Sequence, residues 1–247
     1  MAAKRTALVT GASYGVGAAT ACALARDGFD VAVTATKVEN LAGTVKTLDP
    51  LGVRVVPVVL DLRNEASIAR VAAEVIASLG GLDLLVNNAC ANLRKLAAEV
   101  SGEEWDAVMA VNVRGTFFLT QQVGRHFMVA GRGGCIVNIA STHALIGAAE
   151  RSTYGISKAA LIGMTRMLAV EWAGHGIRVN AIAPGRLDTA SPSRAGKGAD
   201  REYMAAMLKR IPLRRQVTAD EVAAAVTYLA SPAAASITGQ VLVPMAG

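Results

Sequence analysis

At 247 residues, of which 53% are hydrophobic and 18% charged, the chain is long enough to bury a large core, and we expect one domain spanning residues 1–247. Three cysteines without a C-x-x-C spacing and three scattered histidines give no support to a disulfide framework or a metal site, so no metal is predicted. The first ten residues pass from two charges into an apolar run too short for a signal or membrane segment, which indicates a cytoplasmic protein without a membrane partner.

The net charge of +6 is concentrated in residues 186–215, which hold eight Lys or Arg against three acids. This stretch loses regular periodicity and gathers Ser, Gly and Pro, so we expect a substrate flap there, with an ordinary surface loop as the alternative. Few aromatic residues accompany the charges and no nucleic-acid motif is present, so no nucleic-acid partner is predicted. The charges indicate either solvated helix faces or an anionic substrate.

Short apolar runs alternate with helical stretches along the whole chain. Strands are predicted at residues 6–10, 31–35, 53–60, 82–88, 134–140, 177–183 and 237–244, and helices at residues 18–26, 65–79, 103–129, 152–173 and 219–230. This alternation predicts an α/β fold with a doubly wound parallel sheet of about seven strands and helices on both faces.

A glycine-rich turn, Thr10 to Gly17, lies between the first strand and the first helix. Glycines let backbone N–H groups approach a phosphate, and the helix N-terminus adds its positive end. The turn therefore predicts a dinucleotide site, although a tight connection would use the same residues.

A hydroxyl, a phenol and an ammonium gather between Ser141 and Lys158. In a helix from about Ser152, Tyr154 and Lys158 stand four residues apart and are neighbours on one face. A phenol beside an ammonium releases its proton more readily, so Tyr154 becomes a candidate acid and base. The same spacing also occurs by chance on many helices.

Several motifs in this order resemble those of the short-chain dehydrogenase/reductase family. Thr10 to Gly17 is similar to its T-G-x-x-x-G-x-G, Asn87-Asn88-Ala89 to its N-N-A-G, Asn112 to the asparagine of N-V-x-G, and Pro184-Gly185 to its P-G turn, while Ser141 stands thirteen residues before Tyr154. The resemblance runs from about Lys4 to Gly247. It implies a Rossmann-like fold and an NAD(P)(H)-dependent oxidoreductase that transfers a hydride between nicotinamide and a carbonyl or secondary alcohol.

The resemblance also implies residue roles. Tyr154 exchanges the proton, Ser141 binds the reacting oxygen, Lys158 assists the phenol and binds ribose, and Asn112 holds a relay water, unless it only satisfies a kink in the long helix. Substrate contacts are expected from Ser141, His143 and Arg186. The expected cofactor contacts are Gly11, Ser13, Tyr14, Gly15, Val16, Gly17, Thr36, Lys37, Asp61, Leu62, Asn88, Ala89, Tyr154, Lys158, Pro184, Gly185, Leu187 and Thr189, of which Asp61 and Asn88 have capping a helix or turn as the alternative.

Cofactor choice depends on the end of the second strand, which carries Lys37 and no acid, so NADP(H) is favoured over NAD(H), with a solvated surface lysine as the alternative for Lys37. Tyr14 weakens that preference, because many NADP-using relatives have a basic residue there. Cys90 replaces the last glycine of N-N-A-G, and we expect a small packed residue, with a reshaped pocket or an oxidisable thiol as alternatives. Met245-Ala246 stands where relatives often end in Asp-Gly.

The resemblance does not identify the substrate. In general pattern the chain resembles 3-oxoacyl-carrier-protein reductases together with sugar, polyol and steroid dehydrogenases, which the motifs do not separate. Val170 stands before Glu171 where the carrier-protein reductases often have arginine, which counts against that member of the group. A silent dinucleotide-binding sensor is a second hypothesis, against which the complete set of four catalytic residues speaks, and a nucleotide-sugar epimerase is a third. The resemblance also suggests a homotetramer built partly through the two long helices, whose apolar outer faces would otherwise be exposed.

Overall fold

One seven-stranded sheet, in the order β3-β2-β1-β4-β5-β6-β9, forms the centre of the computed structural model, which describes residues 4–188, 208–209 and 211–244. Every neighbouring pair in this sheet is parallel. Its strands are β1 Thr6–Val9, β2 Asp30–Ala35, β3 Val55–Val59, β4 Leu84–Asn87, β5 Gly134–Ile139, β6 Ile177–Ile182 and β9 Val241–Leu242. The order reverses between β1 and β4, so the doubly wound, Rossmann-like prediction is confirmed.

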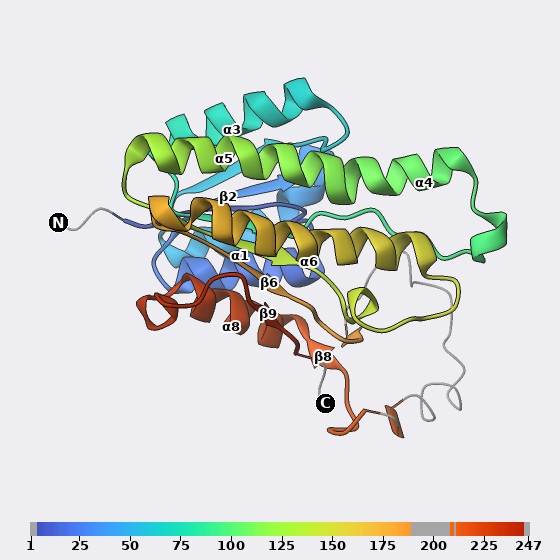
Figure 1. Ribbon diagram of the computed structural model, residues 1–247. Coiled ribbons are helices and arrows are strands. Elements are labelled where there is room, and N and C mark those ends of the chain that lie inside the picture. Colours follow the sequence, from blue (N-terminus) through green and yellow to red (C-terminus); the bar gives the residue numbers. More distant parts are fainter. Residues whose placement is uncertain (1–3, 189–207, 210, 245–247) are drawn as a thin grey trace.

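Helices cover both faces of the sheet (Figure 1). One face packs against α1, α2 and α8, and the other against α3, α5 and α6. The bounds are α1 Gly15–Arg26, α2 Ala42–Leu48, α3 Glu65–Leu79, α4 Gly102–Met109, α5 Thr116–Ala130, α6 Ser152–Trp172 and α8 Ala219–Ala230. Because both faces are covered, β1, β2 and β4 are buried along their whole length, which explains their unbroken apolar runs.

The predicted helix over residues 103–129 is wrong as one continuous α-helix. A π-helix, η4 Ala110–Gly115, separates α4 from α5. The Thr116 hydroxyl donates to the carbonyl of Val111, five residues earlier, at 3.0 Å. The backbone of Gly115 also lies against the loop after β3, since a Cβ added there would come within 2.0 Å of the Leu62 carbonyl oxygen. The π-helix therefore coincides with a close approach between Gly115 and Leu62, a tertiary contact that the apolar periodicity of the sequence does not reveal.

Two further boundaries differ from the prediction. The last strand covers only Val241–Leu242 instead of residues 237–244, because Gly239 makes a turn at φ 71° before the chain joins β6. Most of the predicted flap at residues 186–215 lies outside the described residues. Its beginning forms β7 Leu187–Asp188, which pairs in parallel with β8 Val217–Thr218, a small second sheet that was not predicted.

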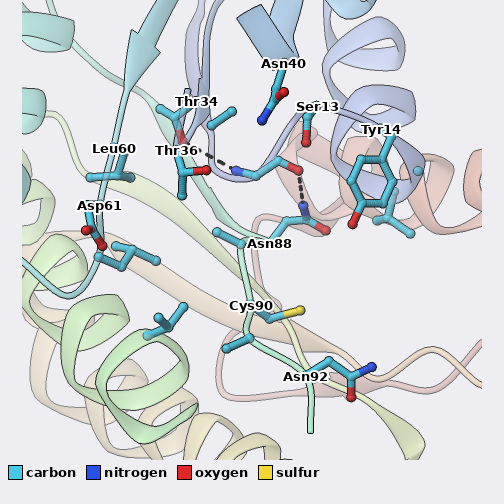
Figure 2. A pocket seen from close by; sticks show the side chains of 18 of the residues that line it. Ser13, Tyr14, Thr34, Thr36, Asn40, Leu60, Asp61, Asn88, Cys90 and Asn92 are labelled. Carbon is cyan, nitrogen blue, oxygen red and sulfur yellow. Dashed lines mark hydrogen bonds between the residues drawn. The ribbon is translucent and has the colours of Figure 1, made fainter. Parts of the chain in front are cut away.

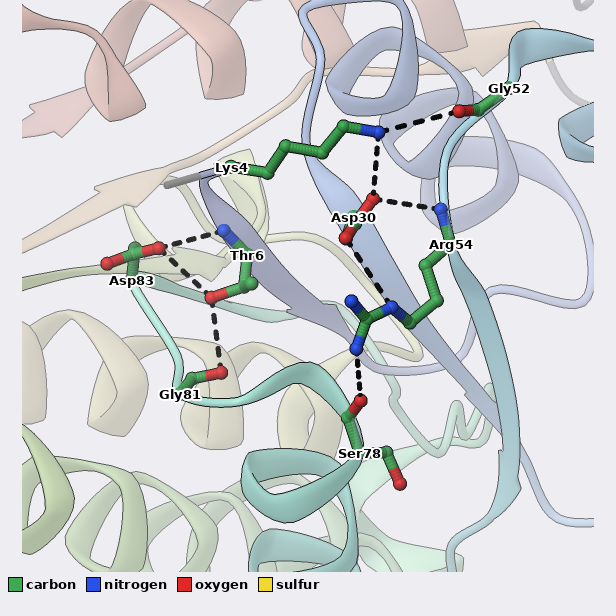
Figure 3. A network of polar contacts seen from close by, with 8 residues as sticks. All are labelled: Lys4, Thr6, Asp30, Gly52, Arg54, Ser78, Gly81 and Asp83. Carbon is green, nitrogen blue, oxygen red and sulfur yellow. Dashed lines mark hydrogen bonds and ion pairs between the residues drawn. The ribbon is translucent and has the colours of Figure 1, made fainter. Parts of the chain in front are cut away.

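A polar network joins the amino ends of β1, β2 and β4 (Figure 3). Asp30, which is 3% exposed, accepts a hydrogen bond from the backbone N–H of Arg54 at 2.8 Å and forms an ion pair with Lys4 at 3.7 Å. Asp83 accepts from both the N–H and the hydroxyl of Thr6, at 2.8 and 3.0 Å. These carboxylates accept hydrogen bonds from backbone N–H groups at the amino ends of the strands. The predicted motifs follow the opposite, carboxyl ends.

Candidate functional site

A cavity of about 610 Å³ lies where the first four strands of the chain end (Figure 2). Its wall is built from the turn after β1, the end of β2, and the loops after β3 and β4. The lining residues are Gly11, Ser13, Tyr14, Gly15, Val16, Thr34, Ala35, Thr36, Asn40, Leu60, Asp61, Leu62, Arg63, Asn88, Ala89, Cys90, Ala91, Asn92, Ala107, Val111, Tyr154 and Leu187. The cavity therefore occupies the topological switch point of the sheet, where open α/β folds bind ligands.

The glycine turn forms one wall of this cavity. Gly11 and Gly15 have φ values of 63° and 60°, in the left-handed region that favours glycine. A Cβ at Gly11 would come within 2.7 Å of the Ala89 Cα, and a Cβ at Gly17 within 2.3 Å of the Gly11 carbonyl oxygen. These glycines let the turn pack tightly against the loop after β4 and the start of α1.

The N-terminus of α1 begins at the cavity without a cap. Tyr14 precedes the helix in an extended conformation, its side chain makes no capping hydrogen bond, and the first turn contains no acidic residue. The first N–H groups of a helix have no partner within the helix and carry its positive end. Together with the small glycines, this arrangement fits a dinucleotide pyrophosphate.

Asn88 holds the glycine turn rather than simply facing the cavity. Its amide donates to the carbonyl oxygens of Thr10 and Gly11, both at 2.9 Å, and its own backbone N–H donates to the Thr10 hydroxyl at 2.9 Å. Figure 2 shows the Asn88 contact to Gly11 across the base of the cavity. The turn-capping alternative is therefore what the contacts of Asn88 show.

Most of the predicted cofactor residues line this one cavity. Those that do so are Gly11, Ser13, Tyr14, Gly15, Val16, Thr36, Asp61, Leu62, Asn88, Ala89, Tyr154 and Leu187. Gly17, Lys37, Lys158, Pro184 and Gly185 are described but are not among the lining residues, and Thr189 lies outside the described residues. Lys37 is exposed beyond the end of β2, so its position does not bring its charge into the cavity wall.

The predicted acid/base residue, Tyr154, lines the same cavity as the glycine turn. Tyr154 is in the first turn of α6 and lines the cavity, and the ammonium of Lys158 is 5.7 Å from the centre of its ring. Lys158 is only 2% exposed and donates to the Ile139 carbonyl at 2.7 Å, which fixes the ammonium beneath the phenol. The predicted helical neighbours are thus held together by the end of β5.

Ser141 and His143 approach Tyr154 from the segment after β5. The Ser141 hydroxyl oxygen accepts from the backbone N–H of His143 at 3.2 Å, so its own proton stays available for donation. The ring of His143 meets that of Tyr154 edge to face, with centres 6.2 Å apart. Burial, and secondarily the charge of Arg151, lowers the pKa of His143, so this ring is neutral near pH 7.

Asn112 is buried and makes three hydrogen bonds from the π-helix. Its amide donates to the Ala91 carbonyl and the Ser157 hydroxyl, both at 2.9 Å, and its oxygen accepts from the Ala91 N–H at 2.7 Å. The Ser157 hydroxyl in turn donates to the Tyr154 carbonyl at 2.7 Å. Asn112 therefore connects the loop after β4 to the helix that carries Tyr154, and none of these three hydrogen bonds satisfies the backbone of its own helix, which was the predicted alternative.

Cys90 is exposed and lines the cavity, so the expectation of a packed side chain is wrong. The reason is that the chain leaves the sheet after Asn87 and turns its next residues towards the cavity. Asn40, Arg63, Ala107 and Val111 also line the cavity and were not predicted from the sequence. Arg63 had a signal, because it follows Asp61 at a strand end, whereas Ala107 and Val111 arrive through the packing of α4 and η4.

Among the described residues, no group of three or more His, Cys, Asp or Glu is placed to hold a metal ion. Within the same parts of the chain, no helix combines the length and apolar character needed to cross a membrane. The lining of the cavity includes the small residues of the glycine turn and the phenol of Tyr154, whose ring lies 5.7 Å from the buried Lys158 ammonium. Its residues fit a nicotinamide dinucleotide.

Comparison with known proteins agrees with this geometry. Residues 11–247 match the family model described as enoyl-(acyl carrier protein) reductase. The 3-oxoacyl-[acyl-carrier-protein] reductase of Thermotoga maritima is 39% identical over 238 residues, which cover 96% of this chain and 95% of the relative.

Two solved structures resemble this chain over nearly its whole length. A protein of Sinorhizobium meliloti 1021 described as a short-chain alcohol dehydrogenase has a TM-score of 0.94 and 42% identity, covering 98% of this chain and 95% of that one. Actinorhodin polyketide ketoreductase, in a variant solved with NADPH, has a TM-score of 0.92 and 35% identity, covering 99% of this chain and 97% of that one. The chain belongs to the short-chain dehydrogenase/reductase family of NAD(P)-dependent oxidoreductases.

Proposed function

We propose that this chain is an NADP(H)-linked ketone reductase or secondary alcohol dehydrogenase in which Tyr154 is the acid and base. The main support is that Tyr154 lines the same cavity as the glycine turn before the uncapped helix α1, with the Lys158 ammonium 5.7 Å from the Tyr154 ring. One cavity can thus hold a dinucleotide at one end and a reacting oxygen at the other.

The bound nicotinamide supplies or accepts the hydride. In the reductive direction, Tyr154 donates its proton to the carbonyl oxygen, and the Ser141 hydroxyl donates a hydrogen bond to the same oxygen. The neighbouring Lys158 favours the phenolate that this transfer leaves, because opposite charges attract strongly away from bulk water. In the oxidative direction, the phenolate takes the proton from the alcohol.

The preference for NADP(H) has two supports. Asp61 is the one acidic residue among those lining the described cavity, and it follows β3, so no carboxylate at the end of β2 would repel a 2′-phosphate. The related actinorhodin ketoreductase was solved with NADPH. Lys37 is exposed and is not among the cavity-lining residues, so a contact between its ammonium and a 2′-phosphate stays a prediction.

The substrate class stays open among carbonyl and alcohol compounds. The relatives act on different molecules, since one is named for a carrier-protein thioester and another for a polyketide. Four expectations stay predictions. They are substrate contact by His143 and Arg186, an anionic substrate, a cytoplasmic location, and a single domain over residues 1–247.

We also propose a homotetramer that uses the outer faces of α5 and α6. Val170 and Met167 on α6 are 81% and 65% exposed, and Val129 at the end of α5 is 90% exposed. An apolar surface of this kind is more stable when a second subunit covers it.

Replacing Tyr154 by phenylalanine tests the proposed chemistry. The variant keeps the ring but lacks the proton, so we expect turnover to fall by about 10²–10⁴-fold while NADPH binding changes little. The measurement follows the absorbance of NADPH with a panel of β-ketoacyl thioesters, sugars and diketones, and in the reverse direction with alcohols and NADP⁺. NADPH binding is measured separately by fluorescence titration.

Wild-type protein that binds NADPH but turns over neither ketones nor alcohols would contradict the enzymatic proposal and favour a sensor. Undiminished turnover in Tyr154→Phe would contradict the role of the phenol alone. A Tyr228→Phe variant is a matched control, since Tyr228 is an exposed phenol on α8 that is not among the cavity-lining residues.

A further inference from the structure

Glu150 has a strained backbone at the entrance to α6. Its φ is 60°, in the left-handed region that is unfavourable for a residue with a side chain and that glycine adopts readily. In the described parts of the chain, Arg214 is the only other non-glycine residue with a positive φ. Strained residues of this kind cluster at functional sites, where the surrounding contacts hold them.

Three contacts join Glu150 and its neighbour Arg151 to the loop after β4. The Glu150 carboxylate accepts from Nε of Arg94 at 2.5 Å, and the Glu150 backbone carbonyl accepts from the N–H of Lys95 at 3.0 Å. Nη1 of Arg151 donates to the side-chain oxygen of Asn92 at 2.7 Å. In Figure 1 this loop, which leads from β4 to α4, passes the start of α6. We call these three contacts the loop clamp.

The loop clamp lies directly before the residue proposed as acid and base. Helix α6 begins at Ser152, and its N-cap residue, Arg151, makes no side-chain capping hydrogen bond. Tyr154 is therefore in a first turn without the kind of cap that begins α3, α4 and α8. Helix ends fray, and a fraying first turn would move the phenol relative to Lys158. The clamp ties down the residues that lead into this turn.

The other side of the clamp reaches the cavity. Asn92 and Ala91 both line it, and Figure 2 shows Asn92 following Cys90 along the cavity wall. Ala91 is already held by the buried Asn112 through its N–H and carbonyl. The loop thus has one anchor inside the protein and a second, the clamp, at the surface. The clamp joins this part of the wall to the helix turn that carries Tyr154.

We propose that Glu150 is a positioning residue for Tyr154: its ion pair with Arg94 holds the loop after β4 against the start of α6 and takes the place of a helix cap. The inference rests on the proposed function, because Glu150 acts through the residue proposed there as acid and base. A glycine at this position would relieve the backbone strain, so stability alone favours its replacement. Stability and positioning therefore make opposite demands on this residue, which separates the two in an experiment.

The test compares variants of the clamp with a matched ion pair elsewhere. The clamp variants are Glu150→Gly, Arg94→Glu, and the double variant Arg94→Glu/Glu150→Arg, which restores an ion pair with the charges exchanged. Arg70→Glu is the control, because Arg70 forms a similarly exposed ion pair with Glu74 on α3 at 2.6 Å and is not among the cavity-lining residues.

Four quantities are measured for each variant. They are kcat and KM with NADPH and the panel ketone that wild type reduces fastest, the dissociation constant of NADPH, the melting temperature, and the deuterium exchange of the peptide that covers residues 148–158. The exchange measurement reports on the first turn of α6 without requiring turnover.

We expect Glu150→Gly to melt no lower than wild type and up to roughly 4 °C higher, because strain is relieved and an exposed ion pair contributes little to stability. In the same variant kcat should fall roughly tenfold, since a small displacement of a reacting group slows the chemistry strongly, while the dissociation constant of NADPH stays within about twofold. Exchange in residues 148–158 should become faster. Arg94→Glu should lose kcat to a similar extent, the double variant should recover most of it, and Arg70→Glu should keep the wild-type value.

A Glu150→Gly variant with wild-type kcat, or with unchanged exchange in residues 148–158, would overturn the inference while leaving the proposed function intact. A kcat that falls only together with the melting temperature would overturn it as well, because Glu150 would then have a purely structural role. So would a double variant as slow as Arg94→Glu, because the ion pair would not be what holds the loop. If wild type binds NADPH but reduces no ketone and oxidises no alcohol, the proposed function itself fails, and the role of Glu150 fails with it.

Discussion

Asn112 shows how one buried side chain can serve both the fold and the site. Its three hydrogen bonds join the loop after β4, the π-helix and Ser157. Ser157 contacts the backbone carbonyl of Tyr154, so Asn112 is two hydrogen bonds away from the residue proposed as acid and base. Its position therefore affects both the cavity wall and the start of α6.

Replacing Asn112 by alanine should destabilise the protein. The change leaves the N–H and carbonyl of Ala91 and the Ser157 hydroxyl without this partner, at a site that is 1% exposed. A buried group left unsatisfied costs about 1–3 kcal/mol, so we expect the free energy of unfolding to fall by about 2–3 kcal/mol. Urea unfolding measures the change.

Arg125→Ala is a suitable control for Asn112, since Arg125 lies exposed on the following helix, α5. A stability of Asn112→Ala equal to that of the control would mean that water replaces the missing amide. In that case, the hydrogen bonds that Asn112 makes between the loop and α6 would contribute nothing to the free energy of unfolding.

At the scale of elements, the helix starts divide into two kinds. Helices α4 and α8 begin with capping boxes, formed by Ser101 with Glu104 and by Thr218 with Glu221. Asn64 caps α3. Helices α1, α2 and α6 start with no side-chain cap, and of these α1 starts at the glycine turn that lines the cavity. The protein thus satisfies the N-termini of α3, α4 and α8 internally and leaves the N-terminus at the cavity available to a ligand.

The capping box of α8 should make stability depend on pH in the acid range. Hydrogen bonds from Arg215, and then from the Thr218 backbone, lower the pKa of Glu221 from 4.5 to about 2. Its stabilising effect is therefore complete above about pH 4.5 and is lost as the pH falls towards 2. We expect Glu221→Gln to be less stable than wild type at pH 7 and equal to it at about pH 2.

Thr218→Ala gives the comparison for this pH dependence. It removes the acceptor of the Glu221 N–H and should cost about 1 kcal/mol, with no titrating group removed. Urea unfolding of both variants across this pH range measures the effects. A stability difference for Glu221→Gln that does not shrink in acid would contradict the role given to the ionised carboxylate.

At the scale of the whole molecule, the amino ends and the carboxyl ends of the sheet strands have different roles. The amino ends of the strands are joined by the Asp30 and Asp83 contacts, whereas the carboxyl ends open into the cavity. The remaining large surface feature is the apolar exterior of α6, with Val170 at 81% exposure. This exterior is the basis for the proposed tetramer.

Replacing Val170 by aspartate should weaken the assembly, because burying an unpaired charge in an apolar interface is unfavourable. We expect light scattering after size exclusion to show a tetramer for wild type and smaller species for Val170→Asp. Val59→Asp is the matched control, since Val59 is an exposed valine on the edge strand β3. A wild-type protein that is monomeric at micromolar concentration would contradict the proposal.

The sheet was predictable because its parallel strands are buried on both faces and therefore appear as unbroken apolar runs. Their approximate bounds followed, and so did the glycine turn, whose place between β1 and α1 indicates its use. The last strand was predicted too long, since nothing local distinguishes the turn at Gly239 from a strand.

The cavity was predictable in the glycine turn and Tyr154, which belong to motifs, and in residues that follow β3 and β4 directly. Asn40 belongs to no such motif, the signal for Arg63 was only its place after Asp61, and Ala107 and Val111 come from α4 and η4. Lys37 also lies outside the lining, because a residue beyond a strand end points wherever its local turn directs it, and its contact with a cofactor stays a prediction. Contacts of this kind depend on how segments meet in space, which periodicity does not encode.

The π-helix at Ala110–Gly115 sets the direction in which the side chains of α4 face relative to those of α5. A π-turn accommodates one residue more than an α-turn, so the segment behaves as a single-residue insertion absorbed without breaking the helix. One residue corresponds to about 100° of rotation. Deleting a residue here would turn Val108 of α4 away from its present orientation relative to Leu119 and Val123 of α5, all of which are buried. The extra residue lets both helices bury their apolar sides while Asn112 faces the loop beside the cavity.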